Sequence, residues 1–282
     1  MYLTRKSSDA RSIFNKAMTV LAGTLVVVAL IPLLAVLSYV LIKGAGRLNL
    51  DLLTKLPPPP MVPGGGIANA IVGTLIMVGL ASLISVPIGI GSAIFLSEFS
   101  NPTTAQWIRF ATNVLNGVPS IILGVFAYSA LVVTTKTFSA YAGAVALSIL
   151  MLPTIIRTTD EALKIVPQEI RWASLGIGAA KYQTVLQIVL PAALPTIVTG
   201  VTLAIARAAG ETAPLIFTAL STQFWPNSLS QPTPSLAVLV FNFATVPFKN
   251  QQELAWAASL ILVLLVLTTS IISRFALRRK TY

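Results

Sequence analysis

The feature that most limits the possible folds is an apolar run at residues 17–42, which contains no charged side chain. About 20 apolar residues are enough to cross a bilayer as one helix. Further long apolar runs follow, and 55% of the 282 residues are hydrophobic while 10% are charged. A soluble domain cannot bury that much apolar surface. The chain is therefore predicted to be an all-α, polytopic membrane protein.

Six transmembrane helices are predicted from apolar runs that polar or basic segments separate. The expected spans are residues 17–42, 67–96, 114–133 and 140–156, one within 190–220, and 254–273. They divide the chain into a cytoplasmic N-terminal segment (1–16), the first span, a periplasmic loop (43–66), a permease core (67–276) and a basic cytoplasmic tail (277–282). The core includes a cytoplasmic loop (157–190) and an outer loop (221–253). Within the outer loop, residues 235–244 are too short to span and are expected to form a surface or re-entrant helix.

The basic residues predict the orientation. With the N-terminus inside, thirteen Lys and Arg residues fall on the inner side and five on the outer side. The inner ones are Arg5, Lys6, Arg11, Lys16, Arg109, Arg157, Lys164, Arg171, Lys181, Arg274, Arg278, Arg279 and Lys280. The outer ones are Lys43, Arg47, Lys55, Lys136 and Lys249. Both termini are therefore expected in the cytoplasm of a cell with an inner membrane.

Composition excludes several functions. The net charge of +11 is explained by membrane topology, because the basic residues flank apolar segments, and no nucleic acid is expected as a partner. The chain contains no Cys and no His, which excludes disulfides, thiol chemistry and the usual zinc sites. It has no Gly-x-x-x-x-Gly-Lys-Ser/Thr phosphate loop, so energy for transport is expected from another subunit or from a gradient.

A polar stretch at residues 169–195 is expected to form a helix, a turn and a second helix at the membrane surface. Gly178 allows the sharp turn, and Pro191 suits the start of the second helix because it has no N–H to lose. The spacing Gly178, nine residues, Ile188-x-Leu190-Pro191 resembles the EAA loop of ABC importer permeases. The resemblance implies that the loop docks a cytoplasmic ATPase. The docking residues would be Arg171, Trp172, Ala173, Ser174, Gly178, Ile188, Leu190 and Pro191, with Trp172 at the position of the family's glutamate.

Two charged residues lie well inside a predicted span. Arg207 and Glu211 are four residues apart, so on a helix they share one face and can pair. Charges at this depth are costly, so both are expected to face the protein interior. They are either a structural ion pair or part of a translocation path or its gate, where the arginine suits an oxyanion. Asn116, Gly117, Pro119 and Ser120 either open the third helix or form an unwound segment that lines the path.

Four stretches resemble one family, the permease subunits of phosphate-specific ABC importers. They are ARAAGETAP (206–214), PGGGIANAIVGTL (63–75), LNGVPSIILGVF (115–126) and MLPTIIRTTDEALKIVP (151–167). Of the two permease types in that system, the chain is more similar to the PstA type than to the PstC type. The resemblance implies the type I (MetI-like) permease fold and import of inorganic phosphate by alternating access.

The same resemblance implies a set of partners. They are a second permease of the PstC type, two copies of a cytoplasmic ATPase of the PstB type, a periplasmic phosphate-binding protein of the PstS type, and membrane lipid. ATP and magnesium would be bound by the ATPase, so this chain is expected to be non-hydrolytic and to hold no cofactor or metal. Three alternatives are a permease for another oxyanion, such as sulfate or molybdate, a gradient-driven carrier, and a membrane scaffold or signalling subunit without a path of its own.

Overall fold

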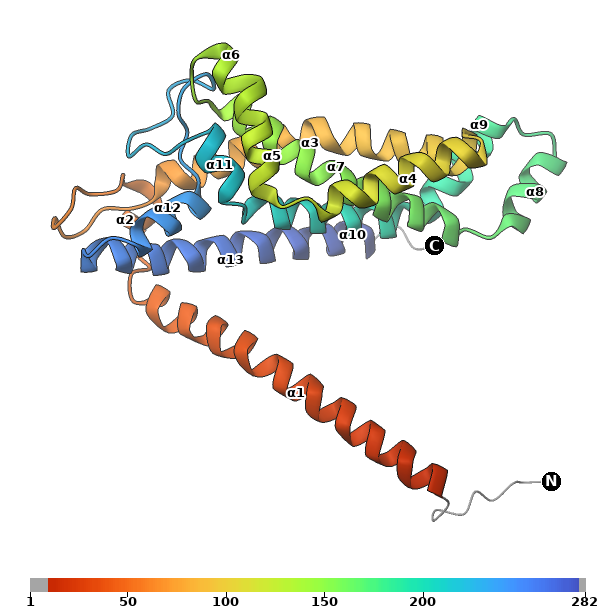
Figure 1. Cartoon of the computed structure of the whole chain (residues 1–282), viewed down its shortest axis with the longest axis horizontal. Coiled ribbons are helices and arrows are strands. Elements are labelled where there is room, and N and C mark those ends of the chain that lie inside the picture. Colours follow the sequence, from red (N-terminus) through yellow and green to blue (C-terminus); the bar gives the residue numbers. More distant parts are fainter. Residues whose placement is uncertain (1–9, 279–282) are drawn as a thin grey trace.

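The structure is a computed structural model and describes residues 10–278. Arg5, Lys6, Arg279 and Lys280, on which part of the orientation argument depends, lie outside the described residues. Figure 1 shows an elongated helical bundle, from which one helix, α1, diverges. The α-helices are α1 (Ala10–Ala45), α2 (Leu50–Thr54), α3 (Ala68–Ile94), α4 (Pro102–Gly117), α5 (Ser120–Ala127), α6 (Val133–Thr135), α7 (Ala140–Ile165), α8 (Gln168–Gly176), α9 (Lys181–Thr184), α10 (Leu190–Ala209), α11 (Ala213–Thr218), α12 (Leu236–Ala244) and α13 (Lys249–Arg278).

Three π-helical turns extend or join these helices: η1 (Phe95–Phe99), η2 (Tyr128–Val132) and η3 (Val185–Val189). Five helical segments within residues 10–278 are long and apolar enough to cross a membrane, and a sixth results if the bent pair α4 and α5 is counted as one span. The all-α, polytopic prediction is confirmed.

The third span differs from its prediction. Residues 114–133 do not form one straight helix, because α4 ends at Gly117 and the helical pair bends by 99° before Ser120. Pro119 explains the break, since it has no N–H for a helical hydrogen bond and disfavours the α conformation in Val118. Residues 97–109, between the second and third predicted spans, are also largely helical. Asn101 caps α4 by accepting a hydrogen bond from the Thr104 N–H at 2.8 Å.

The core of the bundle lies between α3, α7, α10 and α11. Small residues let these helices approach closely. At Gly89 on α3, an added Cβ would lie 2.7 Å from Cγ2 of Ile155 on α7. The innermost side chains include Met77, Leu147 and Met151, each fully buried.

The short helix expected at residues 235–244 is present as α12, but it is not a surface helix. Leu236 and Leu239 are buried in a second apolar cluster with Leu254 of α13, so the helix is part of the body of the protein. The prediction of a surface helix is wrong because the outer loop folds back over α3. One contact that holds it there is the Leu236 N–H, which donates to the Thr74 hydroxyl at 2.8 Å.

Candidate functional site: the docking loop and the intramembrane pair

The polar stretch at residues 169–195 has the predicted helix–turn–helix shape and lies at one end of the bundle (Figure 1). Gly178 has φ +92°, the left-handed conformation that favours glycine. The turn is closed by backbone hydrogen bonds from Gly178 to Leu175 (3.0 Å) and from Ala179 to Ser174 (3.2 Å). The Ser174 and Thr184 hydroxyls, 2.9 Å apart, join α8 to α9.

The expected helix start at Pro191 is wrong. The second helix begins at Lys181 and continues through η3 into α10 without interruption. Pro191 lies just beyond the π-helical turn, where the Leu190 N–H bonds five residues back to Val185. A proline at this point therefore follows a change in the hydrogen-bond pattern instead of starting a helix.

The docking residues divide into an exposed and a buried group. Trp172 is 66% exposed, and Ile177 in the turn is 86% exposed, so the outer face of the loop presents large apolar side chains. Ala173, Gly178 and Pro191 are also exposed, whereas Ile188 and Leu190 are half-buried. Ser174 and Arg171 are buried. An exposed apolar surface of this kind is typical of a protein-binding site.

Arg171 fastens the loop to the bundle. Its guanidinium forms an ion pair with Glu98 in η1 and also donates to the Leu163 carbonyl at 2.7 Å. The two charged side chains are only 10% and 8% exposed. Arg171 is predicted in the docking loop from the sequence, but its partner is not, because 73 residues separate the two members of the pair.

A second buried cluster lies nearby and was also not predicted. Asp160 of α7 is buried and accepts two hydrogen bonds from Arg109 of α4, at 2.9 Å and 2.8 Å. Lys164, one turn further along α7, pairs with the same carboxylate. Two parallel hydrogen bonds between an arginine and a carboxylate fix the relative orientation of their helices. The cluster therefore holds α4 against α7 at the end of the bundle that carries the docking loop.

Arg207 and Glu211 form an ion pair, with 3.6 Å between Arg207 Nε and Glu211 Oε1. They do not share a helix face, because α10 ends at Ala209 and Glu211 lies in the break before α11. The Arg207 side chain is 47% exposed, while that of Glu211 is 15% exposed. These exposures are those of the single chain and do not test whether both residues face the interior of an assembly, so that expectation stays a prediction.

The segment 116–120 is the bend between α4 and α5. Its Asn116 side chain accepts a hydrogen bond from Thr154 of α7 at 3.3 Å; Ser120 is half-buried, and Gly117 and Pro119 are exposed. Beyond the bend, Gly124 of α5 lies against Pro214 of α11, so the bent pair and the broken α10–α11 pair are neighbours. Among residues 10–278, no hydrogen bond or ion pair joins the bend to Arg207.

The architecture is that of an ABC importer permease. The chain belongs to the family of binding-protein-dependent transport system inner membrane components, which it matches over residues 85–282, and within it to the group of PstA permease proteins. It is 39% identical to the phosphate transport system permease protein PstA of Yersinia pestis, over 99% of this chain and 95% of that protein. It is 43% identical to the PstA protein of Xylella fastidiosa strain Temecula1, over 84% of this chain and 83% of its relative.

Solved structures show the same fold at low sequence identity. An inward-facing structure of the MetNI methionine ABC transporter matches with a TM-score of 0.60 and 22% identity, over 77% of this chain and 95% of that one. A bacterial alginate ABC transporter, in complex with an alginate-bound periplasmic protein, matches with a TM-score of 0.67 and 14% identity, over 95% of both chains.

Proposed function

We propose that this chain is the PstA-type permease subunit of an ATP-driven importer of inorganic phosphate. The observation that carries the proposal is the similarity to the Yersinia pestis phosphate transport permease over 99% of the chain. The intramembrane site supports it, because the half-exposed guanidinium of Arg207 is available to donate paired hydrogen bonds to an oxyanion. Glu211 holds this guanidinium and balances its charge, which keeps the empty site from trapping anions tightly.

The proposal assigns the energy-yielding chemistry to partners. Two copies of a PstB-type ATPase would hold ATP and magnesium, a PstC-type permease would supply the other half of the path, and a PstS-type protein would deliver phosphate from outside. This chain would be non-hydrolytic and would bind no cofactor or metal. Both termini and the docking loop would face the cytoplasm, as the basic residues predict.

Transport would proceed by alternating access. The exposed face of α8 would receive the ATPase, and the buried Arg171–Glu98 pair would transmit its displacement to α3. The Leu163 carbonyl, which also accepts from Arg171, would pass the same displacement to α7. A ligand shifts such an equilibrium only through different affinities for the two states. The path would therefore bind phosphate weakly in at least one of them, and residues 116–120 would move with the bend they form.

The test is uptake of labelled phosphate, with sulfate as the control solute, in cells that have no other phosphate carrier. Cells without this gene would be compared with cells carrying the intact gene, Arg207→Gln or Arg274→Gln. Arg274 is an exposed arginine on α13 and serves as the matched control. We expect phosphate uptake from the intact gene and from Arg274→Gln, and loss of uptake with normal membrane insertion for Arg207→Gln.

Two results would contradict the proposal. Restoration of sulfate uptake instead of phosphate uptake by the intact gene would favour a permease for another oxyanion. Phosphate uptake that continues without ATP or partner chains would favour a gradient-driven carrier. Full activity of Arg207→Gln would remove this residue from the path.

A further inference from the structure

The helices α1 and α13 cross at the end of the bundle opposite the docking loop (Figure 1). The crossing is tight, because a Cβ added to Gly44 would lie 2.8 Å from both the Trp256 carbonyl oxygen and Leu260 Cβ. Away from this point α1 leaves the body, so a wedge opens between the two helices. Only 6% of the apolar span of α1 is buried within this chain, so most of the helix presents an open apolar surface.

A pocket of about 740 Å³ lies beside this crossing, and we call it the outer basic pocket. Its walls carry three cations, Lys43, Arg47 and Lys249, but only one carboxylate, Glu253. Arg47 uses that carboxylate, with Nη2 2.9 Å from its Oε2. Neither lysine forms an ion pair within residues 10–278. Two cations therefore remain available to an anionic ligand.

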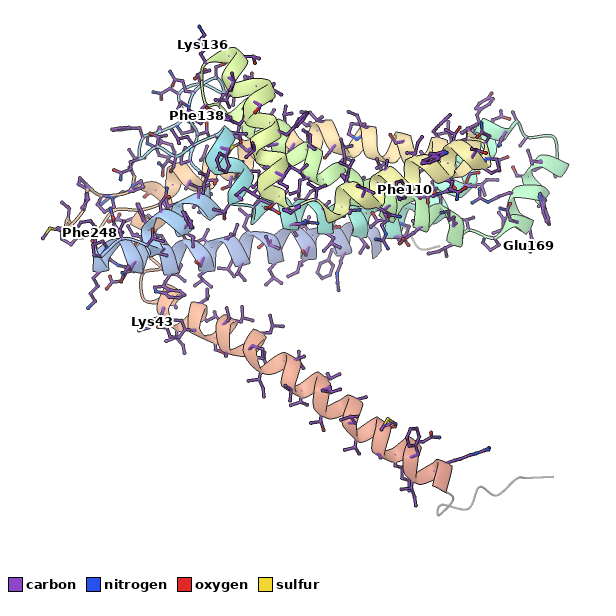
Figure 2. The ribbon with its side chains drawn as sticks, in the orientation of Figure 1. Lys43, Phe110, Lys136, Phe138, Glu169 and Phe248 are labelled. Atoms are coloured by element: carbon purple, nitrogen blue, oxygen red, sulfur yellow. The ribbon has the colours of Figure 1, made fainter. Side chains whose placement is uncertain are left out.

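The pocket also has an aromatic side. The rings of Tyr39 and Trp256 pack edge to face with centroids 5.0 Å apart, and the Lys43 ammonium lies 5.7 Å from the centre of the Tyr39 ring. Ile42 beside them is 72% exposed. Lys43 and Lys249 stand where the apolar spans of α1 and α13 end, as Figure 2 shows for Lys43. Tyrosine, tryptophan and lysine in this arrangement mark the level of the lipid headgroups.

We propose that the outer basic pocket binds the phosphate group of an anionic phospholipid, in the leaflet at the end opposite the docking loop. Lys43 and Lys249 would bind the phosphate, and the acyl chains would lie along the exposed apolar side of α1. A lipid is favoured over a free anion because aromatic and exposed apolar side chains adjoin the cations. The inference does not depend on which solute the chain transports.

The experiment measures lipid binding to the full-length chain. The protein is purified in detergent and titrated with phosphatidylglycerol or phosphatidylcholine, and bound lipid is counted by native mass spectrometry. Each lysine near an anionic headgroup contributes to the free energy of lipid binding. Neutralising both Lys43 and Lys249 should therefore weaken phosphatidylglycerol binding about 30-fold. The test variant is Lys43→Gln/Lys249→Gln.

The matched control is Lys55→Gln/Lys136→Gln, which removes two other lysines that are predicted to lie on the outer side of the membrane. Lys55 pairs with Asp51, and Lys136 is exposed at the end of α6, so neither lines the pocket. Affinity in the control should stay within about twofold of the unchanged chain. An equal loss in both double variants, or no loss in either, would overturn the proposal. Equal binding of phosphatidylcholine, or displacement of the lipid by excess inorganic phosphate, would overturn it as well.

Discussion

Replacing Glu98 by alanine tests how the docking loop is attached to the bundle. The change leaves the Arg171 guanidinium buried without its carboxylate, and only the hydrogen bond to the Leu163 carbonyl remains. The Arg171 Nε already has no hydrogen-bond partner, so the side chain has no second contact that compensates. Both members of the pair are at most 10% exposed, so the cost for a buried pair applies, about 3–5 kcal/mol.

That cost should fall mainly on the local opening of α8. If the free energy of local opening falls by about 3 kcal/mol, the amide hydrogens of α8 should exchange faster by roughly two orders of magnitude. Hydrogen–deuterium exchange of the full-length chain, followed by mass spectrometry of peptides covering residues 168–184, measures it directly. Peptides from the buried middle of α7 should not change, which separates loosening of the loop from general unfolding.

Two further variants sharpen the experiment. Glu161→Ala removes a carboxylate from an exposed pair with Arg157, whose side chains are 58% and 59% exposed, and should cost at most about 0.5 kcal/mol. The double replacement Glu98→Leu/Arg171→Met removes both buried charges, so most of the lost stability should return. If residues 168–184 exchange no faster in Glu98→Ala than in Glu161→Ala, the ion pair does not hold the loop and the reasoning is refuted.

Two glycine substitutions give further tests, each with a control in which the added methyl group meets open space. Gly178→Ala should destabilise the turn by about 1–2 kcal/mol and reduce co-purification of the partner ATPase, because an L-residue is strained at φ +92°. Gly176→Ala, with ordinary φ, should be neutral or slightly stabilising. Equal binding of the ATPase by both variants would contradict the role of the turn. Gly73→Ala should lower the free energy of unfolding by about 1–3 kcal/mol, because its Cβ collides with the Pro234 backbone. Gly79→Ala on the same helix should not, and thermal unfolding of the purified chain compares the two.

Features that depend on local sequence were predictable. Apolar length alone indicates the spanning helices, since the bilayer sets the same minimum for each of them. Gly178 was expected to allow a sharp turn between two helices, and it does so with a positive φ, the conformation that such a turn favours. The Gly-Val-Pro sequence at residues 117–119 indicated an interruption but not its angle of 99°, and the bent pair contacts α7 and α11, which are distant in sequence.

Features that depend on distant segments were not predictable. Nothing near Glu98 or Arg171 in the sequence indicates that they meet, and the same is true of Arg109 and Asp160. The environment of Arg207 depends on more than this chain. Because 47% of its side chain is open in the single chain, burial of its charge requires contacts from another chain, and its interior position stays a prediction.

The nearly bare surface of α1 has a consequence for biosynthesis. Little of its apolar span is buried against the bundle, and a helix satisfies its own backbone hydrogen bonds, so α1 can form in the bilayer before the later helices are made. Its contacts with the body are made with α13, which is synthesised long after it; the Arg47–Glu253 pair joins residues 206 positions apart. The contact that joins α1 to the bundle can therefore form only after the chain has been translated through Glu253.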